Sequence, residues 1–509
     1  MRGIAPGTAR LLASVSVVAA TIMQTLDTTI ANVALPHMQG SMNASIDQVS
    51  WVLTSYMVAT AISTPLTGYL ERRLGRRKLF IGAVAFFVMA SVLCGLALSL
   101  EQIVLYRLIQ GAAGAAIIPL AQASMQDLFP PEQRGQAVAL WGMGVMIGPI
   151  LGPTLGGYLT DAYNWRWIFF INVPIGLMAA IGLATFLPDT PVERRTKFDL
   201  FGFTMLSIAL ASMQLMLDRG HTLDWFSSPE IVIEALLAGA FAWVFLVHMF
   251  TAREPFMSPI PFRDLNFVVG ISVMFLMGVI LFAIMAMLPT FLQTLLGYPV
   301  TTAGNALVSR GVGTMISMAL AGRLIGKYDV RILIGFGIIC MGSSLWQMSD
   351  FTLDTPAMPI ILSGFTQGIG MGFIYVPLSA AAFSTMPARF RTESAATFSL
   401  SRNIGSSIGV SAITTNLAES TQANHAILSQ HINPFSRALD TQLGQGGGMS
   451  GDVSQALPLL NMEVTRQATM LAYIEDFQIL LLLVLLTIPM VLFLTPSKNQ
   501  NVQAAEVYD

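Results

Sequence analysis

Long stretches without charge are the feature that most constrains this chain. Runs such as Leu79–Leu98 and Ile479–Leu494 approach or reach the ~20 apolar residues with which a helix crosses a bilayer. Of the 509 residues, 54% are hydrophobic and 11% are charged, whereas soluble domains carry about 25% charged residues. The chain has too little charge to cover a water-facing surface, so it is predicted to be an all-α polytopic membrane protein.

Fourteen membrane-spanning helices are predicted from these runs and the loops between them. Since this number is even, both termini lie on the same side of the membrane. Of the 26 Lys and Arg residues, 19 fall on the side of the basic loop 72–78, four on the opposite side and three within spans. Because basic loops stay in the cytoplasm, both termini are predicted to be cytoplasmic. The predicted spans are residues 11–35, 49–70, 79–100, 102–126, 136–159, 166–187, 200–218, 229–251, 267–295, 303–325, 331–349, 358–386, 394–415 and 474–495.

An ungapped shift of 257 residues superposes parts of the two halves of the chain. It brings Gly148 onto Gly405 and Gly152 onto Gly409, at equivalent positions of equivalent spans. Chance matching of glycine-rich helices is the alternative, but a duplicated six-helix bundle accounts better for the match. Parallel repeats of this kind place a substrate path between the two halves, near the midplane of the membrane.

Four parts follow from the spans and the repeat. Residues 1–187 form an N-terminal six-helix bundle, and residues 188–266 form two linker helices with cytoplasmic loops. Residues 267–495 form a C-terminal six-helix bundle, and residues 496–509 a cytoplasmic tail. The C-terminal bundle contains a long outside loop, 416–473, which is either a disordered tether or a functional segment.

Asp27, the deepest acidic residue in any predicted span, is the candidate for proton coupling. A carboxylate in hydrocarbon is costly and by default marks an ion or proton path. Arg107 lies near the outer end of the span 102–126, and a buried guanidinium needs a partner, which the span of Asp27 can supply. The alternatives are a structural Asp27 satisfied by Thr28 and Thr29, and an Arg107 that snorkels to the interface.

Polar side chains inside the spans are candidates for the substrate path. Arg310 and Arg402 are intramembrane cations of the second half, which either pair with another group or contact an anionic solute. The amides are candidates only because they are polar and lie within spans. The predicted substrate-path residues are Gln24, Asn32, Gln110, Gln122, Arg310 and Arg402.

The predicted span 136–159 carries a glycine at every fourth position from Gly144 to Gly156, which makes a smooth stripe along the helix. Pro149 and Pro153 each remove a helix hydrogen bond and favour a bend. A flat, bent helix suits a sliding contact between the two halves, with static packing as the alternative. The residues of this motif are Gly144, Gly148, Pro149, Gly152, Pro153, Gly156 and Gly157.

The sequence contains no recognisable catalytic or metal-binding motif. Cys94 and Cys340 both lie in apolar runs and form no CxxC pair, so structural zinc and a disulfide framework are not expected. The formal net charge of −2 gives no reason to expect nucleic-acid binding. The chain is therefore predicted not to be an enzyme and to use no metal or other cofactor.

Four motifs resemble signatures of the major facilitator superfamily: LDTTIANVALP (Leu26–Pro36), GYLERRLGRRK after the second span, LYRLIQGAAG in the fourth and GPILGPTLGG in the fifth. The first and the last are similar to the forms found in fourteen-span drug:proton antiporters. WRWIFFINVPIG, LDRGHTLDWFSSPEI and HINPF narrow the likeness to EmrB-type multidrug efflux pumps. The resemblance covers essentially the whole chain.

This resemblance implies the major facilitator fold, with two six-helix bundles and two extra central helices. It also implies a pump of the bacterial inner membrane that expels hydrophobic toxic compounds in exchange for protons. Asp27 would be the coupling acid, and Arg107 the arginine tied to proton transfer. Such pumps work with a periplasmic EmrA-type adaptor and a TolC-like outer-membrane channel, so the loop 416–473 becomes a candidate adaptor contact.

The loop after the second span departs from the family pattern. Gly68, Gly75 and Arg76 match the loop motif that the family uses in conformational change, but Arg72 stands where the family has Asp, with Glu71 just before it. In the family that Asp helps to latch the cytoplasmic ends of the helices. The latch is therefore expected to be absent or to use Glu71.

Three other functions remain open. They are a dedicated proton-coupled exporter of one metabolite or of a fatty or organic acid, a non-transporting scaffold that binds a partner through 416–473, and a membrane-embedded enzyme. The depth of Asp27 argues against a scaffold, and the lack of an acid pair or metal set argues against an enzyme.

With one deep acid and 30 Met and 30 Phe side chains that can repack around varied shapes, the chain is predicted to prefer hydrophobic neutral or weakly acidic substrates over dications.

Overall fold

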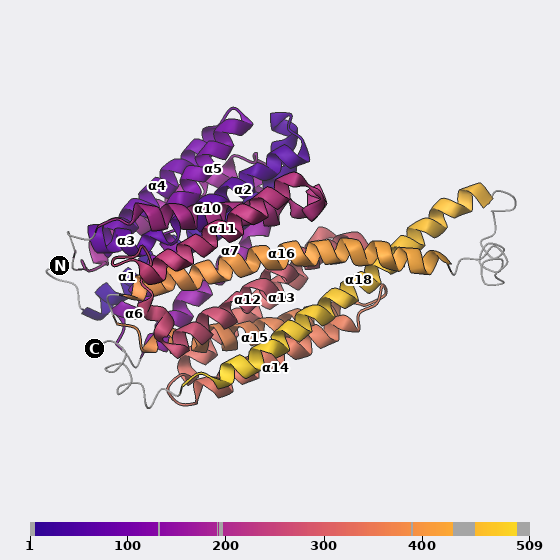
Figure 1. Ribbon diagram of the computed structural model, residues 1–509. Coiled ribbons are helices and arrows are strands. Elements are labelled where there is room, and N and C mark those ends of the chain that lie inside the picture. The colour runs from indigo at the N-terminus through magenta and orange to yellow at the C-terminus, as the bar shows by residue number, and fades with distance from the viewer. Residues whose placement is uncertain are drawn as a thin grey trace.

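The computed structural model describes residues 6–130, 133–190, 192, 197–387, 390–430 and 453–495. The motif HINPF and the predicted tail 496–509 lie outside them. The first helix begins and the last helix ends at the same end of the bundle (Figure 1). We call this the basic end, because it also holds the loop 72–78, and we call the opposite end the far end.

The N-terminal half supplies the first six predicted spans. Ser45 starts α2 with a capping box to Gln48, and α2 and α3, bent by 58° relative to each other, are together long and apolar enough for the second predicted span. The elements are α1 (Pro6–Met42), α2 (Ile46–Ser63), α3 (Leu66–Leu74), α4 (Arg76–Leu96), α5 (Leu100–Gly114), α6 (Ile117–Leu128), α7 (Arg134–Ala162), α8 (Trp167–Phe170) and α9 (Asn172–Phe186).

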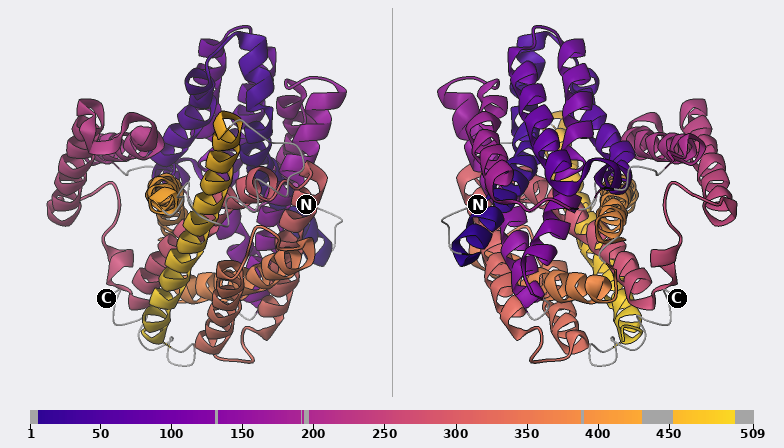
Figure 2. Two further views of the ribbon diagram at one scale, coloured as in Figure 1. Left: turned by 90° about the vertical axis from the view of Figure 1, so that its right-hand side faces the viewer. Right: turned by 90° about the vertical axis from the view of Figure 1, so that its left-hand side faces the viewer.

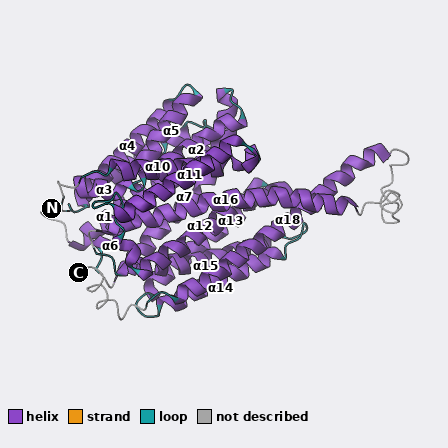
Figure 3. Cartoon of the chain, in the orientation of Figure 1, coloured by secondary structure: helices purple, strands orange, loops and turns teal. Residues whose placement is uncertain are grey.

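Two further helices precede the C-terminal half. Asp264 caps α12 by accepting a hydrogen bond from the Phe267 N–H, and the described residues contain no β-strand (Figure 3). The inserted pair is α10 (Leu200–Arg219) and α11 (Pro229–Thr251), and the C-terminal half consists of α12 (Leu265–Thr290), α13 (Val300–Leu324), α14 (Val330–Ser349), α15 (Ala357–Ser384), α16 (Arg391–Gln430) and α18 (Val453–Leu492).

The helices confirm the predicted fold class. Eleven of the described helical segments are long and apolar enough to cross a membrane, or twelve if the bent pair α2–α3 counts as one span. α13 and α16 occupy the places of the predicted spans 303–325 and 394–415 but are not apolar enough by the same measure. Their polar residues include Arg310 and Arg402, which line an internal cavity. The count of fourteen spans therefore stays a prediction for these two helices.

The described parts of the predicted outside loop 416–473 are helical, and their position outside the membrane stays a prediction. α16 continues to Gln430 and α18 begins at Val453, so both helices run past the ends of the predicted spans. They project together beyond the far end of the bundle (Figure 1). We call residues 416–430 and 453–473 the arm.

Polar side chains hold the two helices of the arm together at its base. Asn416 Nδ2 donates to Asp476 Oδ1 at 2.7 Å, and Asn424 Nδ2 donates to Glu475 Oε1 at 3.1 Å. Polar residues in a segment without an apolar run resemble a loop in the sequence. Here they form bonds between helices, which is why hydropathy alone could not predict the helical arm.

The packing of the glycines follows the internal repeat. A methyl group added at Gly148 would lie 2.5 Å from the carbonyl carbon of Thr25 in α1. A methyl group added at Gly405 would press in the same way against the carbonyl group of Phe275 in α12. α7 thus packs on α1 as α16 packs on α12, with backbone contacts that any larger side chain would prevent.

Ion pairs tie the two halves together at the basic end. Arg72 Nη1 lies 2.7 Å from Glu393 Oε2, which belongs to the first turn of α16. Asp127 at the end of α6 pairs with Arg391, also in α16. The packing is close, because a methyl group at Gly68 would lie 3.0 Å from Glu393 Cβ. The basic end is therefore closed.

This arrangement corrects the expectation that the latch is absent or uses Glu71. Glu71 Oε1 accepts a hydrogen bond from Arg76 Nε at 2.6 Å, so Glu71 acts within its own loop. Arg72, the residue that departs from the family pattern, makes the contact to Glu393 across the halves. The latch is therefore present, but its charges are exchanged: the loop supplies the positive side chain, Arg72, and the opposite half supplies the acid, Glu393.

The inserted helices α10 and α11 stand at the side of the molecule (Figure 2). Asp199 caps α10 and also binds the loop after α11: its carboxylate accepts hydrogen bonds from the N–H groups of Gly202 and Phe256 and contacts His248 Nε2, each at 2.9 Å. Burial raises the pKa of the Asp199 carboxyl, but these bonds outweigh burial and hold it below its ordinary value. These bonds hold the two inserted helices, α10 and α11, together at the basic end.

We expect Gly152→Ala to destabilise the protein and Gly157→Ala to leave its stability unchanged. A methyl group at Gly152 would lie 2.9 Å from Thr29 Cβ in α1, whereas nothing lies within 4 Å of one at Gly157. Overpacking of this kind costs about 1–3 kcal/mol. Thermal unfolding of the two purified variants in detergent measures the difference, and equal midpoints would contradict the close packing of α7 on α1.

Candidate functional site

The centre of the N-terminal half holds an ion pair that is sealed from solvent. Arg107 Nη1 on α5 lies 2.6 Å from Asp27 Oδ2 on α1. Asp27 is 0% exposed and Arg107 is 1% exposed. Arg107 therefore does not snorkel to the interface. Because an unpaired charge is far more costly inside a protein than a paired one, the two side chains depend on each other.

Neutral side chains complete the surroundings of Asp27. Gln110 Nε2 and Asn172 Nδ2 both donate to Asp27 Oδ1, at 2.9 and 2.7 Å. Gln110 Oε1 accepts a second bond from Arg107 Nη1 at 2.9 Å, and Asn172 Nδ2 also reaches Ser91 Oγ at 2.9 Å. Gln110 and Asn172 thus occupy both lone pairs of Oδ1, whereas Oδ2 accepts a bond from Arg107 alone among the described residues and keeps a lone pair for a proton.

Helix α2 covers the other face of the guanidinium. Arg107 Nε donates to the carbonyl oxygen of Val52 at 3.2 Å. One turn further along α2, the ring of Tyr56 lies 4.1 Å from the central carbon of the Arg107 guanidinium, a cation–π contact. Backbone and aromatic ring of α2 thus hold Arg107 against Asp27.

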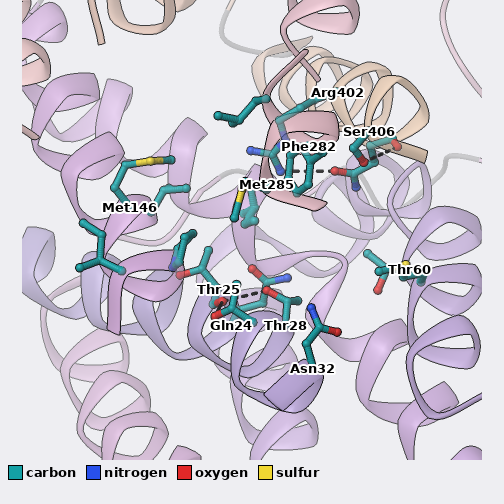
Figure 4. Close-up of a pocket in the computed structure, with 18 of the residues that line it drawn as sticks. Gln24, Thr25, Thr28, Asn32, Thr60, Met146, Phe282, Met285, Arg402 and Ser406 are labelled. Atoms are coloured by element: carbon teal, nitrogen blue, oxygen red, sulfur yellow. Dashed lines mark hydrogen bonds between the residues drawn. The ribbon is translucent and has the colours of Figure 1, made fainter. Parts of the chain in front are cut away.

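A cavity of about 670 Å³ lies between the two halves (Figure 4). Its lining includes Thr28 and Asn32 of α1 and extends to Val33 and Gly157, in the parts of α1 and α7 nearer the far end. The ion pairs described above close the basic end. The cavity therefore faces the far end.

The charged side chains of the described cavity lining are two cations, which lie among neutral polar and apolar side chains. Arg310 of α13 and Arg402 of α16 both line it, and the described lining contains no Asp or Glu. Arg310 Nη1 and Arg402 Nε are buried and have no hydrogen-bond partner among the described residues. Met146, Phe282 and Met285 add adaptable apolar surface (Figure 4). Across the described residues, no group of three or more His, Cys, Asp or Glu side chains is placed to hold a metal ion.

The predicted substrate-path residues divide into two groups. Gln24, Asn32, Arg310 and Arg402 line the cavity. Gln110 belongs to the surroundings of Asp27, and Gln122 is 1% exposed with neither amide atom bonded within the described residues. Neither of these two belongs to the cavity lining. The roles of all six residues in transport stay predictions.

Sequence reasoning missed several residues of the site. An amide in the middle of an apolar span is a signal that would have found Asn172, whereas nothing in the pattern distinguishes Ser91 or Tyr56. A second fully buried acid, Asp476 in α18, was missed because it stands near the start of the predicted span 474–495. Asp476 bonds to Asn416 and makes no ion pair among the described residues.

Comparison with known proteins places the chain in a family. The family model of the Major Facilitator Superfamily matches residues 17–410. The chain belongs to this family. It is 36% identical over 476 residues to the multidrug export protein EmrB of Escherichia coli (strain K12), which covers 92% of each chain. It is 34% identical over 494 residues to the fatty acid resistance protein FarB of Neisseria gonorrhoeae, which covers 96% of this chain and 97% of that one. These relatives confirm the resemblance to EmrB-type pumps.

Solved structures agree on the fold. The proton:xylose symporter XylE matches with a TM-score of 0.60 at 14% identity, over 94% of this chain and 95% of that chain. The human organic anion transporter MFSD10 matches with a TM-score of 0.59 at 12% identity, over 94% and 100%. Together with the apolar helices, this makes the chain a multi-pass membrane protein with the major facilitator fold.

Replacing one member of the ion pair is expected to destabilise the protein more than replacing both. Asp27→Asn leaves a buried, charged Arg107, at a cost of about 3–5 kcal/mol. Adding Arg107→Gln removes that charge, so the double variant should recover most of the loss. Thermal unfolding in detergent at neutral pH measures all three proteins. A double variant no more stable than Asp27→Asn would show that the two charges do not depend on each other.

Proposed function

We propose that this chain exports hydrophobic compounds from the bacterial cytoplasm in exchange for protons. The observation that carries the proposal is the sealed pair of Asp27 and Arg107 beside a cavity that faces the far end. An acid within a membrane-spanning bundle is costly and marks a proton path by default. The multidrug export protein EmrB, a relative over nearly the whole chain, supports the same function.

Proton binding at Asp27 would act on the contact between the halves through α1 and α7. A proton on Asp27 removes the negative charge that holds Arg107, so the most favourable arrangement of α1 and α5 changes. α1 packs on the glycine stripe of α7, and α7 touches the opposite half where a methyl group at Gly142 would lie 2.9 Å from Met318 Sδ. Opening of the basic end then requires the Arg72–Glu393 pair to separate.

The cavity supports hydrophobic neutral or weakly acidic substrates over dications. A dication would meet Arg310 and Arg402 with no acid in the described lining to balance its charge. An anionic head group would instead find guanidinium nitrogens that lack partners, and guanidinium groups bind carboxylates well. The apolar remainder of the substrate would lie against the Met and Phe side chains.

A dedicated exporter of a fatty or organic acid is the second candidate. The same two cations favour it, and the relative FarB is named for fatty acid resistance. The breadth of compounds that the cavity accepts distinguishes this candidate from a multidrug pump.

We further propose that the protein lies in the bacterial inner membrane with both termini in the cytoplasm, and that it works with a periplasmic EmrA-type adaptor and a TolC-like outer-membrane channel. The distribution of Lys and Arg supports the orientation. The arm supports the adaptor contact, because it extends beyond the far end and carries exposed apolar side chains, Leu459 at 58% and Met462 at 68%.

Asp27→Asn is expected to abolish transport while substrate binding is retained, because the variant cannot take up and release a proton at this site. Inverted membrane vesicles with an imposed proton gradient and a fluorescent hydrophobic dye report transport at matched expression. Asp476→Asn is the matched control, since this acid is equally buried and an amide keeps the acceptor that Asn416 uses. Transport by Asp27→Asn at the wild-type rate would contradict the proposal.

Binding is expected to rank 11-(dansylamino)undecanoate above its methyl ester, and both above a bis-quaternary ammonium compound with an alkyl chain of the same length. Arg402→Gln should weaken binding of the acid by about tenfold or more, since a hydrogen bond to a charged group contributes about 1.5–3 kcal/mol, and should leave the ester unaffected. Dansyl fluorescence of purified protein measures the affinities. Equal weakening of acid and ester would argue against an anion site at Arg402.

A further inference from the structure

Export of a neutral or anionic compound in exchange for a proton requires a link between two separate sites. A cation can compete with a proton for one carboxylate, but a neutral or anionic molecule cannot. The structure separates the sites, because Asp27 and Arg107 are both absent from the cavity lining and are at most 1% exposed. Something else must therefore make binding of the substrate and binding of the proton depend on each other.

Tyr56 touches both sites. Its ring lies 4.1 Å from the guanidinium carbon of Arg107, and the residue also lines the cavity. Its hydroxyl oxygen accepts a hydrogen bond from Gln24 Nε2 at 3.2 Å, and Gln24 lines the cavity as well. Tyr56 is 3% exposed, so its ring separates the ion pair from the cavity.

The space around the ring allows it to move mainly towards the cavity. On the α5 side the fit is tight, because a methyl group added at Gly114 would lie 3.1 Å from the Tyr56 hydroxyl oxygen and 3.0 Å from Phe87. Beside the ring, Gln24 Oε1 is buried without a partner among the described residues. A bound molecule that donates a hydrogen bond to Gln24 would therefore lie directly against Tyr56.

We propose that Tyr56 is the positioning residue that makes substrate binding and protonation of Asp27 mutually exclusive. A molecule in the cavity holds the Tyr56 ring on Arg107, which keeps Arg107 on Asp27 and closes the route to the carboxylate. When the molecule leaves, the ring turns into the vacated space and opens that route. A proton from the aqueous phase then adds to Asp27 Oδ2, at the lone pair that the bond from Arg107 leaves free, while Arg107 keeps its charge.

This coupling needs no substrate charge, so it serves neutral and weakly acidic compounds alike. The titratable groups that face the pair are Tyr56 of α2 and Cys94 of α4, whose Sγ lies 3.7 Å from Gln110 Oε1. The groups that α9 and α4 otherwise contribute, Asn172 and Ser91, do not titrate. Of these two titratable groups that face the ion pair, Tyr56 belongs to the described cavity lining and Cys94 does not.

The test measures proton release on binding of a neutral probe, the methyl ester of 11-(dansylamino)undecanoic acid, by the purified full-length protein in weakly buffered detergent with a pH-indicator dye. In the wild type, binding should release protons, and the affinity of the probe should fall at low pH by a factor within the usual range of coupling, about 5–150-fold. Tyr56→Leu should bind the probe but release few protons, with an affinity that no longer depends on pH. Tyr56→Phe keeps the ring over Arg107 and should behave like the wild type.

Tyr375→Leu is the matched control. Tyr375 is a buried tyrosine that lines the same cavity from α15, but it packs on Trp141 at 6.2 Å between ring centroids rather than on the ion pair. The Tyr375→Leu variant should bind the probe with lower affinity and keep the pH dependence of binding. If Tyr56→Leu does not fold, Tyr56→Met offers a more adaptable side chain without an aromatic face.

The inference rests on the proposed proton-coupled export, and the outcomes separate the two. Wild-type protein that binds the probe without releasing protons at any pH would overturn both. Wild-type protein that couples, together with Tyr56→Leu or Tyr56→Met that couples equally well, would overturn the role of Tyr56 alone. Loss of pH dependence in Tyr375→Leu as well would also overturn it, since any change in the cavity would then suffice.

Discussion

The ion pair between Asp27 and Arg107 is the constraint on which the N-terminal half depends. Two charges without solvent contact are tolerated only if they are paired with each other and hydrogen-bonded, and the side chains that do this come from α1, α4, α5 and α9. Close approach of α5 to α2 makes this possible, since a methyl group at Gly111 would lie 2.5 Å from the carbonyl oxygen of Tyr56. The buried ion pair therefore depends on a small residue at Gly111, which lets α5 approach α2 closely enough.

The C-terminal half repeats the backbone arrangement without repeating this chemistry. Gln367, which the shift of 257 residues relates to Gln110, is 1% exposed and has neither amide atom bonded within the described part of the chain. In place of a sealed ion pair, this half presents Arg310 and Arg402 to the cavity. One half is thus specialised to hold an acid away from water and the other to offer cations to whatever enters the cavity.

Hydropathy and charge predicted the fold class and nearly all the helices, because a bilayer imposes length and polarity on each span independently of the others. The same reasoning found Asp27 and Arg107, since a charge inside an apolar run stands out. It could not show that Gln110 belongs to the ion pair rather than to the substrate path, because helix rotation is set by packing between distant segments. It also missed the helical arm, where polar residues such as Asn416 pair across helices, and Tyr56, an aromatic residue among many.

Helix α16 has a mechanical consequence. It is 40 residues long and unbroken from Arg391 to Gln430, about 60 Å at the usual rise of 1.5 Å per residue. The same rod carries Glu393 of the latch, Arg402 of the cavity and the first helix of the arm. If the C-terminal half tilts as a rigid body when the latch separates, a rotation of about ten degrees moves the tip of that rod by about 10 Å, given this length. Helix α16 therefore links the latch at the basic end to the position of the arm beyond the far end.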